Sequence, residues 1–178
     1  KLSMTAGLVA LFSRELALPF VAVMFLASLA DRNRKEALAW LLGTLAFFSV
    51  LAVHAIQVHD LTHSNANFNF AQWLALSGWD YVLATIQVHP FLFVFPSWCT
   101  AVLAPLALLG FLAWRDAMGK RVGLTIAAYI LIFLFIGRNN NAYWGLLYCN
   151  LVPLGLLYAP VVLSDILSPH RAASALTD

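Results

Sequence analysis

Long apolar stretches separated by short polar segments form the pattern of this chain. Five of them are long enough to be expected to cross a membrane, and they cover residues 2–30, 37–58, 97–114, 122–137 and 142–167. They are too long for barrel strands and do not alternate with period two. Because a backbone in lipid must satisfy its own hydrogen bonds, such runs form helices. The sequence predicts an all-α, polytopic transmembrane bundle of about five spans.

Composition supports an integral, multi-pass membrane protein. Hydrophobic residues make up 62% of the chain, charged residues only 10%, and the mean hydropathy is +0.84. A soluble domain carries roughly 25% charged residues. No basic run of the kind that binds nucleic acid is present. We therefore expect one transmembrane helical domain over residues 1–178 that contacts membrane lipid.

Basic residues predict the orientation of the spans. Two short loops, Asp31–Glu36 and Arg115–Arg121, hold most of the lysines and arginines and should be cytoplasmic. Lys1, the segment from His59 to Pro96 and the Arg138 loop then lie outside. Both flanks of Tyr81–Val94 are on the outer side, so this segment should not cross the membrane. Pro90 interrupts it, and we expect an outer interfacial or re-entrant helix.

Arg14 and Glu15 lie inside the first apolar stretch. A charge at membrane depth is costly unless it is paired or hydrated, and it indicates a functional role by default. Neighbouring helical residues point about 100° apart, so the two side chains do not simply pair with each other. Either they line a water-filled cavity, or the helix breaks here and leaves them at the outer surface.

A polar segment beginning at Arg138 follows the fourth span on the predicted outer side. Arginine suits phosphate because its planar fork binds two oxygens at once. Asn139 and Asn141 can both donate to and accept from sugar hydroxyls, and Tyr143 follows them. The alternative is an interfacial turn with an aromatic belt.

Other chemistry-bearing residues carry weaker signals. His59 and His63 share a helical spacing but lack an acidic or cysteine companion at motif spacing, so we expect no metal site. Asp60 and Asp80 are the acids of the predicted outer segment, where a general base would be needed. Solvated loop carboxylates are the other interpretation, and the catalytic residue stays unknown. No cofactor is expected.

Several short motifs resemble one enzyme family. Ser13-Arg14-Glu15 and the block Gly137–Gly145 resemble the later helices of bacterial GT-C-type membrane glycosyltransferases, in the branch linked to cell-surface glycopolymers. Ser77-Gly78-Trp79, Pro96-Ser97-Trp98 and Gly155–Pro160 fit the same pattern. The resemblance covers most of the chain and its motifs are short.

The resemblance implies a lipid-linked sugar donor. Enzymes of this family take sugar from a polyprenyl phosphate at the outer face of the bacterial inner membrane, with an acidic base in their first outer loop. That base would precede Lys1, so the chain is expected to be the C-terminal portion of a longer protein and inactive alone. Donor-binding residues would then be Arg138, Asn139, Asn141 and Tyr143, with Arg14 and Glu15 lining the cavity.

A different class of function remains open. The chain could be a non-enzymatic membrane protein, such as a transporter or flippase component or a structural subunit. Transporters often carry charges or broken helices near mid-membrane in two corresponding halves. Here the polar residues gather on one predicted side, which favours an enzyme working at the interface.

Overall fold

A computed structural model describes residues 2–62, 76–137 and 139–167 of the chain. Within these residues all regular structure is helical, which confirms the predicted all-α class. The chain divides into two compact units, Lys1–Trp73 and Leu74–Asp178, and each is described by itself.

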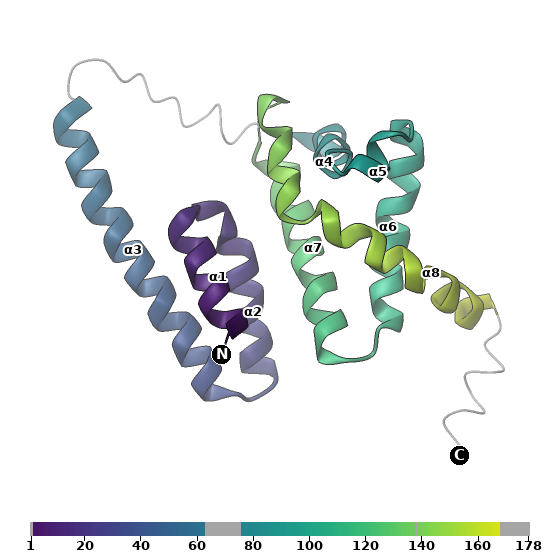
Figure 1. Cartoon of the computed structure of the whole chain (residues 1–178), viewed down its shortest axis with the longest axis horizontal. Helices are drawn as coiled ribbons and strands as arrows, with labels where there is room; N and C mark the ends of the chain where they lie inside the picture. Colours follow the sequence, from purple (N-terminus) through teal and green to yellow (C-terminus); the bar gives the residue numbers. More distant parts are fainter. Residues whose placement is uncertain (1, 63–75, 138, 168–178) are drawn as a thin grey trace. The chain divides into compact units, whose positions relative to one another are not determined.

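The described residues of the first unit form three α-helices and a short 3₁₀ turn. Its elements are α1 (Leu2–Ser13), η1 (Glu15–Ala17), α2 (Leu18–Ala30) and α3 (Arg34–Thr62). In Figure 1, α1 and α2 lie side by side and run in opposite directions, next to α3. A Cβ atom placed on Gly7 would lie 2.8 Å from the Phe20 ring, as expected for a hairpin whose tip is η1.

The first apolar stretch is therefore not one long helix. Arg14 has an extended backbone, with φ −154° and ψ 127°, and separates α1 from η1. Pro19 accounts for this position, because inside a continuous helix it would remove a hydrogen bond and clash with the carbonyl of residue 15. In the structure it lies in the first turn of α2, where proline is tolerated. Both ends of the hairpin face the same end of the unit, unlike a single crossing.

Aromatic contacts pack this hairpin on α3. The Phe12 and Phe47 rings meet edge to face at 5.7 Å, and Phe20 meets Trp40 at 6.1 Å. Asn33 caps the start of α3: its Oδ1 accepts the Glu36 backbone N–H, and its side-chain amide donates to the Glu36 carboxylate. This cap fixes where the basic loop ends and the long helix begins.

The second unit holds the remaining elements. They are α4 (Gly78–Ile86), α5 (Pro90–Phe93), α6 (Ser97–Ala113), α7 (Ala117–Phe135), η3 (Asn139–Leu147), η4 (Cys149–Leu151) and α8 (Val152–Leu167). In Figure 1 the helices α4 and α5 lie at the end of the unit where α6 begins and α7 ends. The loop joining α6 to α7 lies at the other end.

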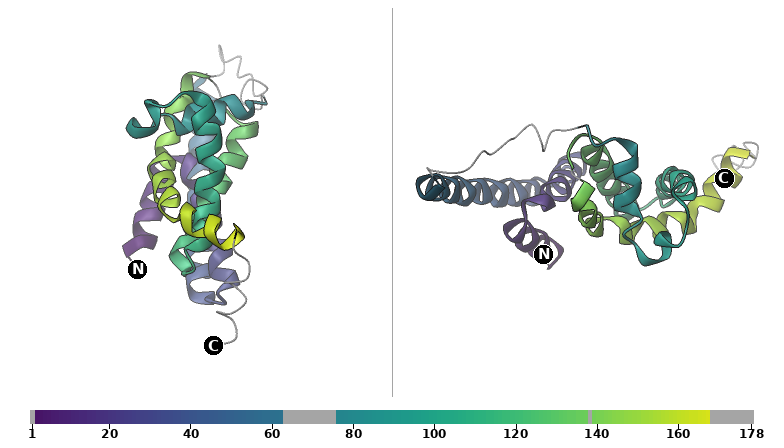
Figure 2. Two further views of the ribbon diagram at one scale, coloured as in Figure 1. Left: turned by 90° about the vertical axis from the view of Figure 1, so that its right-hand side faces the viewer. Right: turned by 90° about the horizontal axis from the view of Figure 1, so that it is seen from above.

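The main packing contact of this unit joins α6 and α8. Figure 2 shows α8 crossing α6 obliquely. At the crossing, a Cβ atom on Gly110 would overlap the Gly155 carbonyl, and one on Gly155 would overlap the Ala107 carbonyl. The two backbones approach this closely because neither glycine has a side chain, as in small-residue contacts between membrane helices.

The span prediction is confirmed only in its coarser form. Among the described residues, three helical segments are long and apolar enough to cross a membrane: Arg34–His59, Ala117–Phe135 and Cys149–Leu167. Shorter apolar helices cover Ser3–Ser13, Glu15–Ala30 and Ser97–Ala113. The segment Tyr81–Val94 forms no straight spanning helix, as predicted, but is divided between α4 and α5.

Candidate functional site

The polar segment after α7 is held against α4 by side chains at every fourth position. Ser77 Oγ donates to the Gly137 carbonyl at 3.0 Å, and the Tyr81 hydroxyl donates to the Asn141 carbonyl at 3.2 Å. Ser77, Tyr81 and Thr85 are spaced i, i+4, i+8, so they share one face of the helix. We call these three residues the α4 ladder.

The last rung of the α4 ladder is a buried pair of hydroxyls. Thr85 Oγ1 lies 2.7 Å from the Tyr148 hydroxyl oxygen and also 2.7 Å from the Val82 carbonyl. The threonine has a single hydroxyl proton, which it donates to Val82, so Tyr148 donates to Thr85. Thr85 and Tyr148 are both fully buried, where a lost partner would leave a costly unsatisfied group.

Two glycines let the segment approach α4. A Cβ atom on Gly145 would overlap the Thr85 carbonyl, and one on Gly137 would overlap the Tyr81 ring. Beneath the segment, the Tyr148 ring stacks on Tyr129 at 5.6 Å with the planes 7° apart. The segment is therefore a fixed part of the unit's core at this end.

The structure describes two of the predicted donor-binding residues fully, one by its backbone alone, and one not at all. Asn141 is half-buried and has a non-helical backbone, with φ −108° and ψ 17°, while Tyr143 is 46% exposed. The backbone of Asn139 begins η3, but its side chain lies outside what the structure describes, and so does Arg138. Asn141 and Tyr143 thus come together on one anchored segment.

The two predicted cavity-lining residues belong to the other unit. Arg14 and Glu15 are both exposed at the tip between α1 and α2. The helix does break here, as one of the two interpretations drawn from the sequence expects, but the placement of the pair at the outer surface stays a prediction. Whether this pair shares a cavity with the Asn141 segment stays a prediction.

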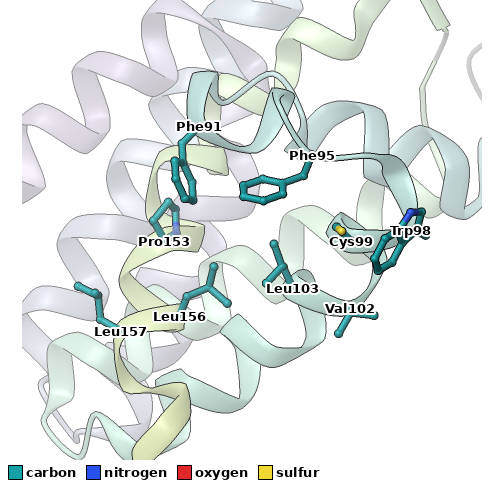
Figure 3. A pocket seen from close by; sticks show the side chains of 9 residues that line it. All are labelled: Phe91, Phe95, Trp98, Cys99, Val102, Leu103, Pro153, Leu156 and Leu157. Carbon is teal, nitrogen blue, oxygen red and sulfur yellow. The ribbon is translucent and has the colours of Figure 1, made fainter.

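An apolar groove opens at the same end of the second unit. Figure 3 shows the rings of Phe91 and Phe95 above side chains of α6 and α8, with Trp98 at the start of α6 to one side. Its volume is about 780 Å³, and its lining consists of Phe91, Phe95, Trp98, Cys99, Val102, Leu103, Pro153, Leu156 and Leu157. The lining residues of α5, α6 and the turn between them follow Thr85 along the chain, and those of α8 follow Tyr148. Its lining suits a hydrocarbon chain, and its volume is typical of ligand sites.

Two polar contacts shape the roof of this groove. The Gln87 side-chain amide donates to the Phe95 carbonyl at 2.9 Å, which ties the end of α4 to the turn before α6. His89 Nδ1 accepts the Phe91 backbone N–H at 3.2 Å and caps α5. His89 therefore has a structural role here, and the described residues contain no cluster of three metal-ligating side chains.

No protein-family model, curated protein sequence or solved structure matches this chain. The functional reading of the site therefore depends on its residues and their geometry.

Sequence reasoning did not identify the residues that hold the site. Ser77, Tyr81, Thr85 and Tyr148 fix the polar segment, yet none was a candidate. The spacing of three hydroxyl side chains at every fourth position from Ser77 was a usable signal, because it places them on one helical face. Their partners are mostly backbone carbonyls, which no side-chain pattern reveals.

Proposed function

We propose that this chain is part of an integral membrane glycosyltransferase that takes sugar from a polyprenyl phosphate at the extracytoplasmic face. Its product would be a surface glycopolymer or glycolipid. The observation that carries the proposal is the presence of two unlike surfaces at one end of the second unit. An anchored polar segment with Asn141 and Tyr143 lies at the end of the unit that holds α4 and α5, and residues of α5 and of the first turns of α6 and α8 line the apolar groove.

The two surfaces correspond to the two parts of such a donor. The groove would accept part of the polyprenyl chain. The Asn141 amide and Tyr143 hydroxyl would contact the sugar hydroxyls. Arg138, which lies outside the described residues, would supply the cation for the phosphate.

In this proposal, the α4 ladder keeps the polar segment rigid. Binding groups that are already held in place lose less conformational entropy when the ligand arrives. The hydrogen bonds from Ser77 and Tyr81 hold the backbone on either side of Arg138. Acid–base chemistry is not assigned to any described residue.

The experiment compares two lipids that differ only in the headgroup. A polyprenyl phosphate and the polyprenol of the same chain length would be titrated into the purified chain in nanodiscs. A charge-assisted contact to the phosphate should favour the first lipid by about tenfold or more. Arg138→Ala should abolish this preference, while Arg138→Lys, which keeps the charge without the fork, should retain part of it.

A tyrosine distant from the polar segment provides the control. Tyr158 stacks on Trp114 at 5.1 Å, close to the loop between α6 and α7. Tyr158→Phe should leave the preference unchanged, whereas Tyr143→Phe should weaken binding of a sugar-bearing polyprenyl phosphate. Equal binding of the phosphate and the alcohol by the unmodified chain would refute the proposal. It would favour a membrane component without a lipid-phosphate site.

A further inference from the structure

A second apolar groove lies between α6 and α7, towards the loop that joins them. Its volume is about 730 Å³. Its lining residues are Pro105, Leu108, Leu109, Phe111 and Leu112 from α6, and Gly119, Lys120, Gly123, Leu124 and Ala127 from α7. Nothing in the proposed glycosyl transfer uses this groove.

Regular spacing shows that each helix contributes one face. On α7 the stripe runs from Lys120 to Ala127 in steps of i, i+3, i+4 and i+7, and on α6 it runs from Pro105 to Leu112 in the same steps. The α7 side of the groove is recessed because Gly123 has no side chain and Ala127 has only a methyl group. A Cβ atom on Gly123 would already lie 2.8 Å from Phe111 Cβ, so the floor of the groove is closed.

Lys120 is the one charged residue of the lining, and it lies at the loop end. It occupies the first turn of α7, while Ala127 lies about 10 Å further along the helix. Lys120 is exposed, so its stem can lie along the apolar wall with the ammonium in the interface. The groove thus has a cationic end and an apolar body.

The surrounding loop adds positive charge. Arg115 and Arg121 accompany Lys120, and Asp116 is the single acid among them. The Asp116 carboxylate accepts the Gly119 backbone N–H at 2.8 Å as the cap of α7. That hydrogen bond lowers the pKa of Asp116 below its ordinary value of 3.8, so its charge stays committed to the helix terminus.

We propose that this groove binds one acyl chain of an anionic phospholipid, with Lys120 at the lipid phosphate. The positive-inside rule assigns this loop to the cytoplasmic face, where anionic headgroups attract juxtamembrane lysines and arginines. A headgroup at Lys120 would leave its chain directed along the stripe towards Ala127. Charge complementarity at one end and apolar lining along the rest select a lipid as the occupant.

The test separates the headgroup from the chain. The full chain would be incorporated into vesicles of phosphatidylglycerol and phosphatidylcholine with the same acyl chains, extracted in mild detergent, and examined by native mass spectrometry for retained lipid. Because the choline cation of phosphatidylcholine offsets the charge of its phosphate, Lys120 should give about a fivefold preference for the anionic phosphatidylglycerol. Lys120→Gln should remove that preference.

A matched lysine tests whether the effect belongs to the groove. Lys35 is exposed in the other basic loop and also lies in the first turn of a helix. Lys35→Gln should keep the preference if it arises at Lys120, and an equal loss in both variants would overturn the proposal. Because Lys120 is exposed, its substitution should not prevent folding.

A groove-filling variant tests the acyl chain. Ala127→Phe retains every charge but fills the apolar body, so retention of both lipids should fall while helicity measured by circular dichroism stays the same. Undiminished lipid retention by a folded Ala127→Phe variant would show that the chain does not lie in the groove. Loss of a dimer signal in the same spectra, with lipid unaffected, would assign the groove to a second copy instead and overturn the proposal.

Discussion

Replacement of Gly110 by alanine tests the packing of α6 against α8 in the second unit. Gly110 lies where α6 crosses α8, and an added Cβ atom would overlap the Gly155 carbonyl oxygen and lie 3.0 Å from the Ala159 nitrogen. All of the nearest atoms belong to the α8 backbone. A rotamer change therefore cannot relieve the overlap, and the two helices must separate.

The expected loss of stability follows from this geometry. Non-bonded carbon atoms pack at about 3.5–4.0 Å, so the new methyl group requires more room than the crossing contains. Overpacking typically costs about 1–3 kcal/mol, and backbone neighbours place Gly110→Ala near the upper end. Because alanine loses less conformational freedom on folding than glycine, the substitution also stabilises the helix by up to about 1 kcal/mol. We expect the free energy of unfolding to fall by about 2 kcal/mol.

The control is the same substitution at Gly43. The three atoms nearest to a Cβ atom there all belong to the side chain of Leu8, which is flexible, unlike the backbone atoms around Gly110. Unfolding in mixed micelles, followed by tryptophan fluorescence as denaturing detergent is added, would give both free energies. Gly43→Ala should match or exceed the parent protein. A Gly110→Ala variant as stable as the parent would refute the close crossing of α6 and α8.

Two further predictions concern the anchored segment and the orientation of the chain. Tyr81→Phe removes the hydrogen bond to the Asn141 carbonyl and should speed hydrogen exchange in residues 139–148, with a stability loss of about 1 kcal/mol; unchanged exchange would mean that the bond does not hold the segment. In a protein whose native cysteines are replaced, cysteine at Asn140 should react with an impermeant thiol reagent in intact cells and cysteine at Asn33 should not. The reverse labelling would contradict the predicted orientation.

Hydropathy predicts which residues are helical more reliably than it predicts where a helix turns. The run 37–58 became α3, and the interruption of the first run at Arg14 was visible in its charge. The return of the chain at that point was not anticipated. Pro19 carried the necessary signal, because proline in the first helical turn marks a new helix as readily as it marks a kink.

The start of the last span shows what hydropathy cannot detect. The sequence predicts it from Ala142, but the α-helix begins at Val152, after two 3₁₀ segments. Tyr148 in this interval bonds to Thr85 of α4, and Asn141 just before it bonds to Tyr81; both partners are distant in sequence. Similarly, α7 begins at Ala117 inside the predicted charged loop. Its cap, Asp116, was a recognisable signal.

The two charges at the hairpin tip determine how the hairpin responds to the membrane potential. Since α2 contains 13 residues, it rises about 20 Å of a roughly 30 Å hydrocarbon layer. A bilayer whose surface lies at the Asp31–Glu36 loop would therefore hold Arg14 and Glu15 within the transmembrane field. Opposite charges at adjacent positions cancel, so the membrane potential does little net work on the tip. Glu15→Gln would leave one charge, worth roughly 1.5 kcal/mol per 100 mV at that depth. A hairpin that is insensitive to voltage would then become a voltage-responsive element.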